Sequence, residues 1–274
     1  MNLVYKKTNE LENFSKEKII TSLCRLGFNY NQANEIFEKL KVKFEKARTT
    51  QQIFNIILDY LKKHHPALAT KYNLKKGLER FGPTGFPFEK YFARVLNSYG
   101  FKTQNNLFLQ GKCVSHEIDI LAEREEIFII ECKFHHLYFI KTGIKDILTL
   151  WARYLDIKEG NKENFLKEKI FRPWIVTNTK ISLDALDFCY CKNIKITSWN
   201  WPPEENLSRL IEHYGLWPIG ILLSLSNEKL KLLLNKNIIL VADLFDVESE
   251  ELKNLLKDEY ESVINEAKNL LKIN

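Results

Sequence analysis

Three residues near the middle of the chain have types and spacing that could do chemistry. Asp119 is separated from Glu131 by eleven residues, and Lys133 follows Glu131 by two. Their stretch predicts two β-strands, residues 114–122 and 127–134, joined by a tight polar turn. Side chains alternate along a strand, so Glu131 and Lys133 share one face while their neighbours point into a core. Charged groups in so apolar a strand are costly to bury unless they are paired or bind a metal.

The chemistry that fits these residues is metal-assisted hydrolysis of a phosphodiester. Two carboxylates on adjacent antiparallel strands, Asp119 and Glu131, can share a hard divalent cation, Mg²⁺ or Mn²⁺. The ion polarises the phosphate and lowers the pKa of a water molecule. Lys133 can orient that water and offset the charge that builds up on the phosphate oxygens. The alternative is an exposed hairpin in which the acidic and basic side chains are only solvated surface charges.

The motif D-x11-E-x-K, with the sequence HEID at residues 116–119 and ECK at residues 131–133, resembles that of the PD-(D/E)xK nucleases. It looks closest to their Mrr-like restriction endonuclease branch, although an isoleucine stands where many members have a proline before the aspartate. The resemblance implies a DNA endonuclease with a catalytic trio of Asp119, Glu131 and Lys133. It also implies that the two carboxylates are the metal ligands.

Glu89 is a further candidate for this site. It lies near the start of an amphipathic helix predicted over residues 88–98, before the first core strand at residues 101–109. In the nucleases that the motif resembles, this helix often carries a glutamate at the site, where it could hold the metal through water. The alternative is a first-turn glutamate that is stabilised by the helix dipole.

The elements after the motif complete a mixed sheet. A helix through residue 156 is predicted to bury Ile147, Leu148, Trp151 and Leu155. On it, Lys145 and Arg153 could contact DNA phosphates, with solvated surface charges as the alternative. A strand, a helix and a strand follow at residues 173–178, 182–192 and 194–199, a spacing that predicts a parallel crossover. The resulting order, α-β-β-β-α-β-α-β, is that of restriction-endonuclease-like cores, an α/β (α+β) class with a mixed sheet flanked by helices.

Composition limits the other possibilities. Of the 274 residues, 45% are hydrophobic and 28% charged, which is ordinary for a protein with a packed core. No apolar run reaches the length of a membrane span and the first residues do not form a signal peptide, so we expect a cytoplasmic protein without membrane contact. The five cysteines include no CxxC pair, which favours reduced thiols and argues against a zinc site.

Charge is distributed unevenly along the chain. Residues 1–80 carry 16 basic and 8 acidic side chains, a net charge of +8, and residues 81–202 carry 17 and 14, a net charge of +3. Residues 203–274 carry 8 basic and 13 acidic side chains, a net charge of −5. Partners that bear phosphates, DNA above all, therefore belong with the first two segments.

The first 80 residues predict a short strand pair followed by helices, the last of them over residues 67–79. The pattern from Val4 through Lys6, Lys7 and Phe14 to Lys18 resembles the opening of the ATP-cone domain, a regulatory nucleotide-binding module. The resemblance implies that the three lysines contact the phosphates of ATP or dATP, which would act as an effector. Two departures are a lysine at position 7, where the family usually has arginine, and an asparagine at position 9, where it usually has glycine. The alternative is a basic helical domain that binds DNA or only packs against its neighbour.

We therefore predict three domains: an ATP-cone over residues 1–82, a nuclease over 83–202 and a small helical domain over 203–274. In the last, residues 230–245 faintly resemble a helix-hairpin-helix DNA-binding element. The hairpin lacks the glycine that lets backbone amides approach phosphate, which favours packing or dimerisation. The leading interpretation is a metal-dependent DNA endonuclease that responds to ATP or dATP and could form a homo-oligomer. The alternatives are a DNA-binding protein that does not cleave and a nucleotide-sensing oligomeric regulator.

Overall fold

A computed structural model describes residues 3–5, 11–82, 84–137, 139–160 and 170–273. The chain divides into two compact units. The first comprises Met1–Leu74, Ile221–Ser224 and Glu261–Asn274, and the second comprises Lys75–Gly220 and Leu225–Tyr260. The chain thus passes from one unit to the other four times. The three-domain division stays a prediction, and the residues that it assigns to the third domain are shared between the two units.

The first unit is mainly helical. Its elements are β1 (Leu3–Tyr5), β2 (Leu11–Asn13), α1 (Lys16–Arg25), α2 (Tyr30–Lys46), α3 (Thr50–His64) and α4 (Pro66–Tyr72). The two strands are antiparallel. Ser15, Asn29 and Thr49 cap the first three helices by accepting hydrogen bonds from backbone N–H groups. The apolar helix faces meet in one core that includes Ile20, Leu23, Phe37, Phe44, Ile57 and Leu61.

One helix predicted over residues 67–79 is in fact two. α4 ends at Tyr72, and α5 (Leu74–Glu79) follows after Asn73. The Asn73 side chain is buried and donates a hydrogen bond to the carbonyl oxygen of Ile221 at 3.0 Å. The break therefore coincides with a contact to a distant part of the chain, which local sequence patterns do not reveal.

The last helix, α12 (Tyr260–Leu271), belongs to the first unit from Glu261 onward. The Glu266 carboxylate accepts hydrogen bonds from the hydroxyls of Thr70 and Ser224, both at 2.6 Å. It also accepts from the backbone N–H groups of Leu223 and Ser224, at 2.9 and 2.8 Å. One carboxylate thus ties α12, α4 and the segment 221–224 together.

We predict that Glu266→Ala destabilises the first unit by about 2–4 kcal/mol, because several donors lose one charged acceptor at once. Chemical denaturation of the full chain, followed by circular dichroism, measures the loss. Glu250→Ala is the matched control: this side chain on α11 (Ser249–Leu256) is exposed and pairs with Lys253 at 3.0 Å. The control should change stability by less than about 0.5 kcal/mol. Equal effects of the two changes would contradict the role of Glu266.

The second unit is built on a five-stranded mixed sheet. After α6 (Phe86–Ser98), the strands are β3 (Lys102–Gln110), β4 (Ser115–Glu123), β5 (Ile127–Lys133), β6 (Phe171–Thr177) and β7 (Lys195–Thr197). Their order in the sheet follows the sequence, antiparallel from β3 to β5 and parallel from β5 to β7. α7 (Ile144–Glu159) and α8 (Leu183–Lys192) connect the parallel strands. The unit is therefore α+β, and the element order matches the prediction.

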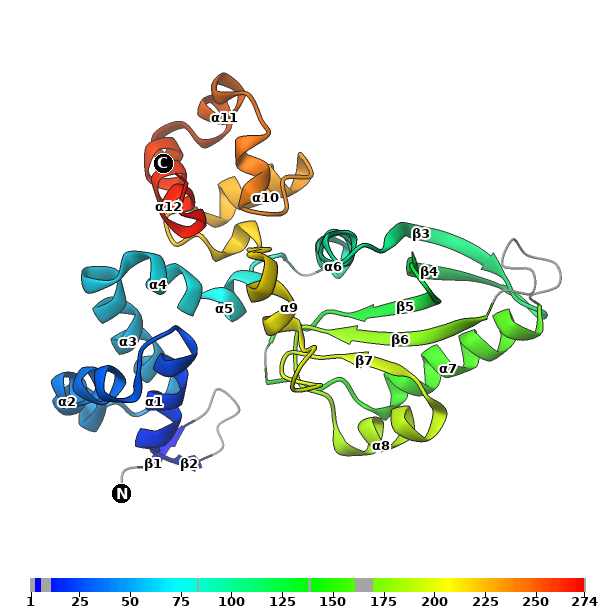
Figure 1. Cartoon of the computed structure of the whole chain (residues 1–274), viewed down its shortest axis with the longest axis horizontal. Coiled ribbons are helices and arrows are strands. Elements are labelled where there is room, and N and C mark those ends of the chain that lie inside the picture. The colour runs from blue at the N-terminus through cyan, green and yellow to red at the C-terminus, as the bar shows by residue number, and fades with distance from the viewer. Residues whose placement is uncertain (1–2, 6–10, 83, 138, 161–169, 274) are drawn as a thin grey trace. The chain divides into compact units, whose positions relative to one another are not determined.

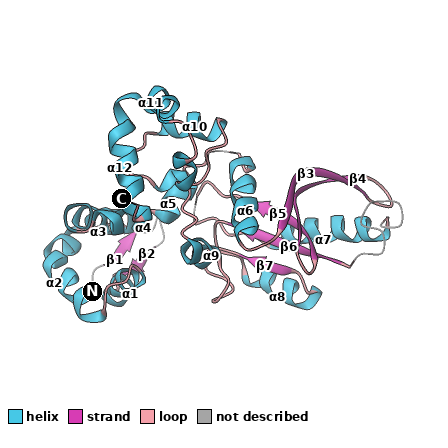
Figure 2. Cartoon of the chain, turned by 45° about the horizontal axis from the view of Figure 1, so that its top comes forward, coloured by secondary structure: helices cyan, strands magenta, loops and turns pink. Residues whose placement is uncertain are grey.

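Helices cover both faces of this sheet. Figure 1 shows α6 on one face and α7 and α8 on the other, and Figure 2 shows β3 and β4 as a long hairpin at the sheet edge. On the α6 side, aromatic rings pack together, with Trp174 5.2 Å from Phe128 and 5.7 Å from Phe92 between ring centroids. On the other side, aliphatic residues of the strands pack against α7, among them Leu121, Ile127 and Ile129. The central strand β5 is consequently buried on both faces.

The face of α7 that the sequence predicts to be buried differs by part of a turn from the face that is buried in the structure. Ile147 is buried as predicted, but Leu148 and Leu155 are 45% and 39% exposed. The helix instead buries Leu150, Tyr154 and Ile157 along with Ile147. Two apolar stripes with helical spacing overlap in this sequence, and the sheet covers the second one.

Three further helices lie mainly in the second unit: α9 (Leu207–Tyr214), α10 (Asn227–Asn235) and α11. Among the described residues, none of the helices has the length and apolar character that crossing a membrane requires.

Candidate active site

The candidate site forms where β4 and β5 cease to pair. Their backbone register runs from Glu123↔Ile127 to Ile120↔Ile130. The next residue on β4 is Asp119, and its side chain replaces the backbone partner: Oδ2 accepts a hydrogen bond from the Cys132 N–H group at 2.7 Å. β5 meanwhile continues alongside β6, as far as Lys133↔Thr177. The carboxylate of Asp119 is therefore fixed directly against the strand that carries Glu131 and Lys133.

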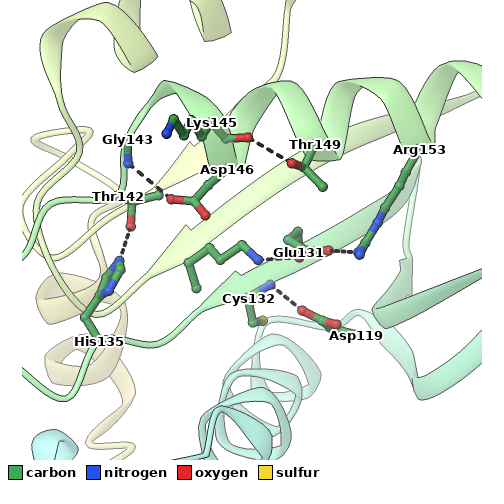
Figure 3. A network of polar contacts seen from close by, with 11 residues as sticks. Asp119, Glu131, Cys132, His135, Thr142, Gly143, Lys145, Asp146, Thr149 and Arg153 are labelled. Carbon is green, nitrogen blue, oxygen red and sulfur yellow. Dashed lines mark hydrogen bonds and ion pairs between the residues drawn. The ribbon is translucent and has the colours of Figure 1, made fainter.

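Glu131 is the centre of the site and is only 6% exposed. Its two carboxylate oxygens bind two cations, with Lys133 Nζ at 2.7 Å and an Arg153 guanidinium nitrogen at 2.8 Å (Figure 3). Burial lowers the pKa of Lys133, but the hydrogen bond and the charge of Glu131 raise it by more, so the net shift is upward and the lysine stays charged. These pairs compensate the cost of placing a charge inside the sheet.

The charges of the two strand carboxylates act on a third acidic side chain, Glu89. It lies in the first turn of α6 and is half-buried. Burial, followed by the charges of Asp119, Glu131 and Glu117, raises the pKa of Glu89 to about 7. Burial and the charge of Glu131 likewise raise the pKa of Asp119 to about 6, against the hydrogen bond from Cys132. The structure thus brings all four predicted catalytic residues, Glu89, Asp119, Glu131 and Lys133, into one region of the second unit.

The oxygen donors present suit a hard divalent cation better than zinc. Magnesium is commonly held by one or two carboxylates together with water and substrate phosphates. Asp119 and Glu131 could supply two such carboxylates. Across the described residues, no three His, Cys, Asp or Glu side chains gather in a group that could hold a metal by themselves. Cys132, the cysteine nearest the site in sequence, has a buried thiol whose pKa is raised well above its usual value by burial.

Sequence reasoning missed part of the surroundings. Arg153 was expected at DNA phosphates, but here it pairs with Glu131. His135 lies in a separate buried network, where its ring contacts the hydroxyl of Thr142 at 3.0 Å, which in turn donates to Thr177 at 2.8 Å. Thr177 lies opposite Lys133 in the parallel register of β5 and β6. That pairing would have placed this network next to the motif lysine, but the register is known only once the fold is known.

His116 is also outside the carboxylate site. Its ring contacts Asp156 of α7 at 2.7 Å, and Asp156 also accepts from the N–H groups of Cys113 and Val114 at 2.9 and 3.3 Å. The hydrogen bond with His116 is the main reason that the pKa of Asp156 falls to about 2. This cluster fixes the β3–β4 hairpin to α7.

The predicted nucleotide contacts lie in the first unit. Lys18 is exposed on α1, three residues after the capping Ser15, whose hydroxyl accepts from the Lys18 N–H group at 3.3 Å. Lys6 and Lys7 lie outside the described residues.

Comparison with known proteins identifies relatives but no activity. No family model matches the chain. Over 182 residues it is 37% identical to an uncharacterized protein of Archaeoglobus fulgidus, an alignment that covers 65% of this chain and 99% of that protein. The chain belongs to the family of this archaeal protein.

Solved structures agree with that relationship. The crystal structure of AF1548, a protein of unknown function, matches with a TM-score of 0.58 and 34% identity, covering 70% of this chain and 100% of that one. This match supports the α+β fold described above. Can2 from Sulfobacillus thermosulfidooxidans, solved in complex with cyclic tetra-adenylate, gives a TM-score of 0.33 at 14% identity, covering 75% and 64% of the two chains. A superposition that weak carries no argument about this chain.

The raised pKa of Glu89 predicts a pH-dependent effect of Glu89→Gln in protein freed of divalent ions by a chelator. The pKa of Glu89 is about 7 in the folded chain, against an ordinary value of 4.5, so the folded chain binds the proton more tightly than the unfolded chain. This proton binding stabilises the fold below pH 4.5, and the stabilisation is lost as the pH rises from 4.5 through 7. Glutamine is neutral throughout. The variant should therefore exceed the wild type in unfolding free energy at pH 8 by roughly 1–3 kcal/mol. It should nearly equal the wild type at pH 5.

Urea denaturation at the two pH values measures this difference. Glu125→Gln, in the exposed turn between β4 and β5, is the control and should show the same stability difference at both. An effect of Glu89→Gln that does not change with pH would contradict the buried, electrostatically crowded position of Glu89.

Proposed function

We propose that this chain is a divalent-metal-dependent DNA endonuclease. The observation that carries the proposal is the meeting of Asp119, Glu131 and Lys133 at the point where β4 and β5 part. Two carboxylates and a lysine in this order on adjacent strands are the residues that the PD-(D/E)xK motif supplies. The element order of the second unit supports a restriction-endonuclease-like core of the Mrr-like branch.

Each residue has a role that its surroundings support. Asp119 and Glu131 would hold Mg²⁺ or Mn²⁺, and the ion supplies the Lewis acidity that polarises a phosphodiester. Lys133 keeps its charge and can stabilise negative charge on the phosphate oxygens. Glu89 would hold the ion through water or accept a proton from an attacking water.

The nearest alternative is a protein that uses the same site to bind DNA without cutting it. Incubation of the full chain with supercoiled, linear and methylated DNA, with Mg²⁺ or Mn²⁺ and with or without ATP, separates the two. Binding without any cleavage under these conditions would favour the alternative.

We expect Asp119→Asn to lose divalent-ion binding and cleavage while the chain stays folded. Asparagine can still accept the Cys132 N–H hydrogen bond, so the variant removes the charge and little else. Lys133→Met should instead keep ion binding and lower the cleavage rate by about 10²–10³-fold, because it removes only charge stabilisation. Calorimetric ion titration and a plasmid cleavage assay measure the two effects.

Asp187→Asn, an exposed carboxylate on α8, is the matched control and should behave as the wild type. Unchanged ion affinity in Asp119→Asn would sink the metal-site assignment. Cleavage at the wild-type rate by Lys133→Met would show that the motif lysine is not catalytic.

We further propose that the first unit is an ATP-cone that binds ATP or dATP. Support comes from its order of strand pair and helices, its basic charge, and the place of Lys18 at the amino end of α1, where backbone N–H groups also favour anions. Regulation would act through assembly of several copies, as in other cone proteins.

ATP or dATP at about 100 times its dissociation constant should stabilise the chain by roughly 2.7 kcal/mol. The double variant Lys6→Ala/Lys18→Ala should lose this gain, because it removes two cations that would face the phosphates. Thermal unfolding with ATP, dATP and GTP measures the gain, and light scattering follows assembly. Lys41→Ala/Lys43→Ala removes two exposed charges from α2 as a control. Stabilisation that persists in the first double variant would place the nucleotide elsewhere.

A further inference from the structure

The two cations on Glu131 differ in where they come from. Lys133 lies two residues farther along the same strand, whereas Arg153 reaches across from α7 (Figure 3). The side chain of Glu131 is 7% exposed and that of Arg153 is 35% exposed, so the pair joins a buried carboxylate to a partly exposed side chain. The interaction thus lies at the boundary between the sheet interior and the outside.

This arrangement sets a limit on what Glu131 can do. Each of its oxygens already contacts a cation, at 2.7 and 2.8 Å, so an ion that binds Glu131 competes with these two cations for the carboxylate. Lys133 is held on the same face of a paired strand and stays near Glu131. Arg153 has a long side chain that is 35% exposed, and it comes from a different element, α7.

The carboxylate closest to Arg153 along α7 does not offer it another partner. Asp156 is occupied by His116 and by the N–H groups of Cys113 and Val114. The charge of Arg153 also acts on Asp119, but in the ion-bound protein that carboxylate would be engaged by the ion. A released guanidinium would then face solvent or an anionic ligand, and its planar set of N–H donors matches phosphate oxygens.

We propose that Arg153 is an exchangeable counter-ion of Glu131 that leaves when a divalent ion binds and then contacts a phosphate of the bound DNA. This inference rests on the proposed function and adds a coupling between ion and DNA. In the ion-free protein Arg153 holds the Glu131 side chain in place. In the ion-bound protein it becomes a positioning residue for the substrate backbone.

The proposal predicts opposite effects of one substitution. Arg153→Met removes the competing cation, so the affinity for Mg²⁺ or Mn²⁺ should rise about tenfold. The same variant loses a phosphate contact, so ion-dependent DNA affinity should fall about tenfold. The slope of the logarithm of DNA affinity against the logarithm of salt concentration should decrease by about one. A residue that only supported the fold would lower both affinities together.

The test is calorimetric titration of Mg²⁺ into the full-length wild type, Arg153→Met and Lys158→Met, followed by fluorescence anisotropy with a short DNA duplex in Ca²⁺. Lys158 is an exposed cation on the same helix, so its variant controls for loss of charge and should match the wild type in both measurements. Arg153→Gln serves as a second variant should methionine prevent folding, and it should show the same two opposite shifts.

The outcomes separate this inference from the function beneath it. If the wild type binds no divalent ion, the proposed function and this inference fail together. If the wild type binds the ion and neither Arg153 variant binds it more tightly, only the counter-ion exchange is overturned. Tighter ion binding with unchanged DNA affinity would overturn the phosphate contact.

Discussion

The second unit depends on the pairing of one buried carboxylate. Glu131 is 6% exposed in a strand covered on both faces, where an unpaired charge would be strongly destabilising, by about 3–5 kcal/mol. The strand itself supplies Lys133, and α7 supplies Arg153. The contact that compensates the buried carboxylate is therefore also one of those that set how α7 is rotated against the sheet, together with its apolar packing and the Asp156 cluster. Fold and candidate chemistry share the same interaction.

That rotation explains what the sequence could and could not predict. Alternation along strands and apolar spacing along helices are local signals, and they were sufficient for the order of elements and for the charged residues on β4 and β5. The buried face of α7 was not a local property, because Leu148 and Leu155 are as apolar as Leu150 and Tyr154. Partners far away in the chain distinguish the two stripes: the apolar residues of the strands, and Glu131, which pairs with Arg153 from 22 residues earlier.

Other features were beyond sequence reasoning for the same reason. The hydrogen bond between Thr70 and Glu266 joins residues 196 positions apart, and no local sequence pattern predicts it. The break of the predicted helix at Asn73 likewise depends on a carbonyl group 148 residues later. A carboxylate or amide that binds backbone groups can do so at any separation, so its partner is known only when the fold is known.

The acidic segment, residues 203–274, contributes to the site indirectly, through α6. Tyr91 donates to the Leu216 carbonyl oxygen at 2.8 Å, and Arg94 pairs with Asp243 at 2.7 Å. Because Glu89 lies on the same helix, these contacts help to hold it beside the strand carboxylates.

Asp243 also binds backbone N–H groups of the hairpin-like segment that precedes it. Its carboxylate accepts the backbone N–H groups of Ile239 and Leu240, both at 2.9 Å. In a DNA-binding hairpin such amides would be offered to phosphate, whereas here an acidic side chain satisfies them. This favours packing over DNA binding for residues 230–245.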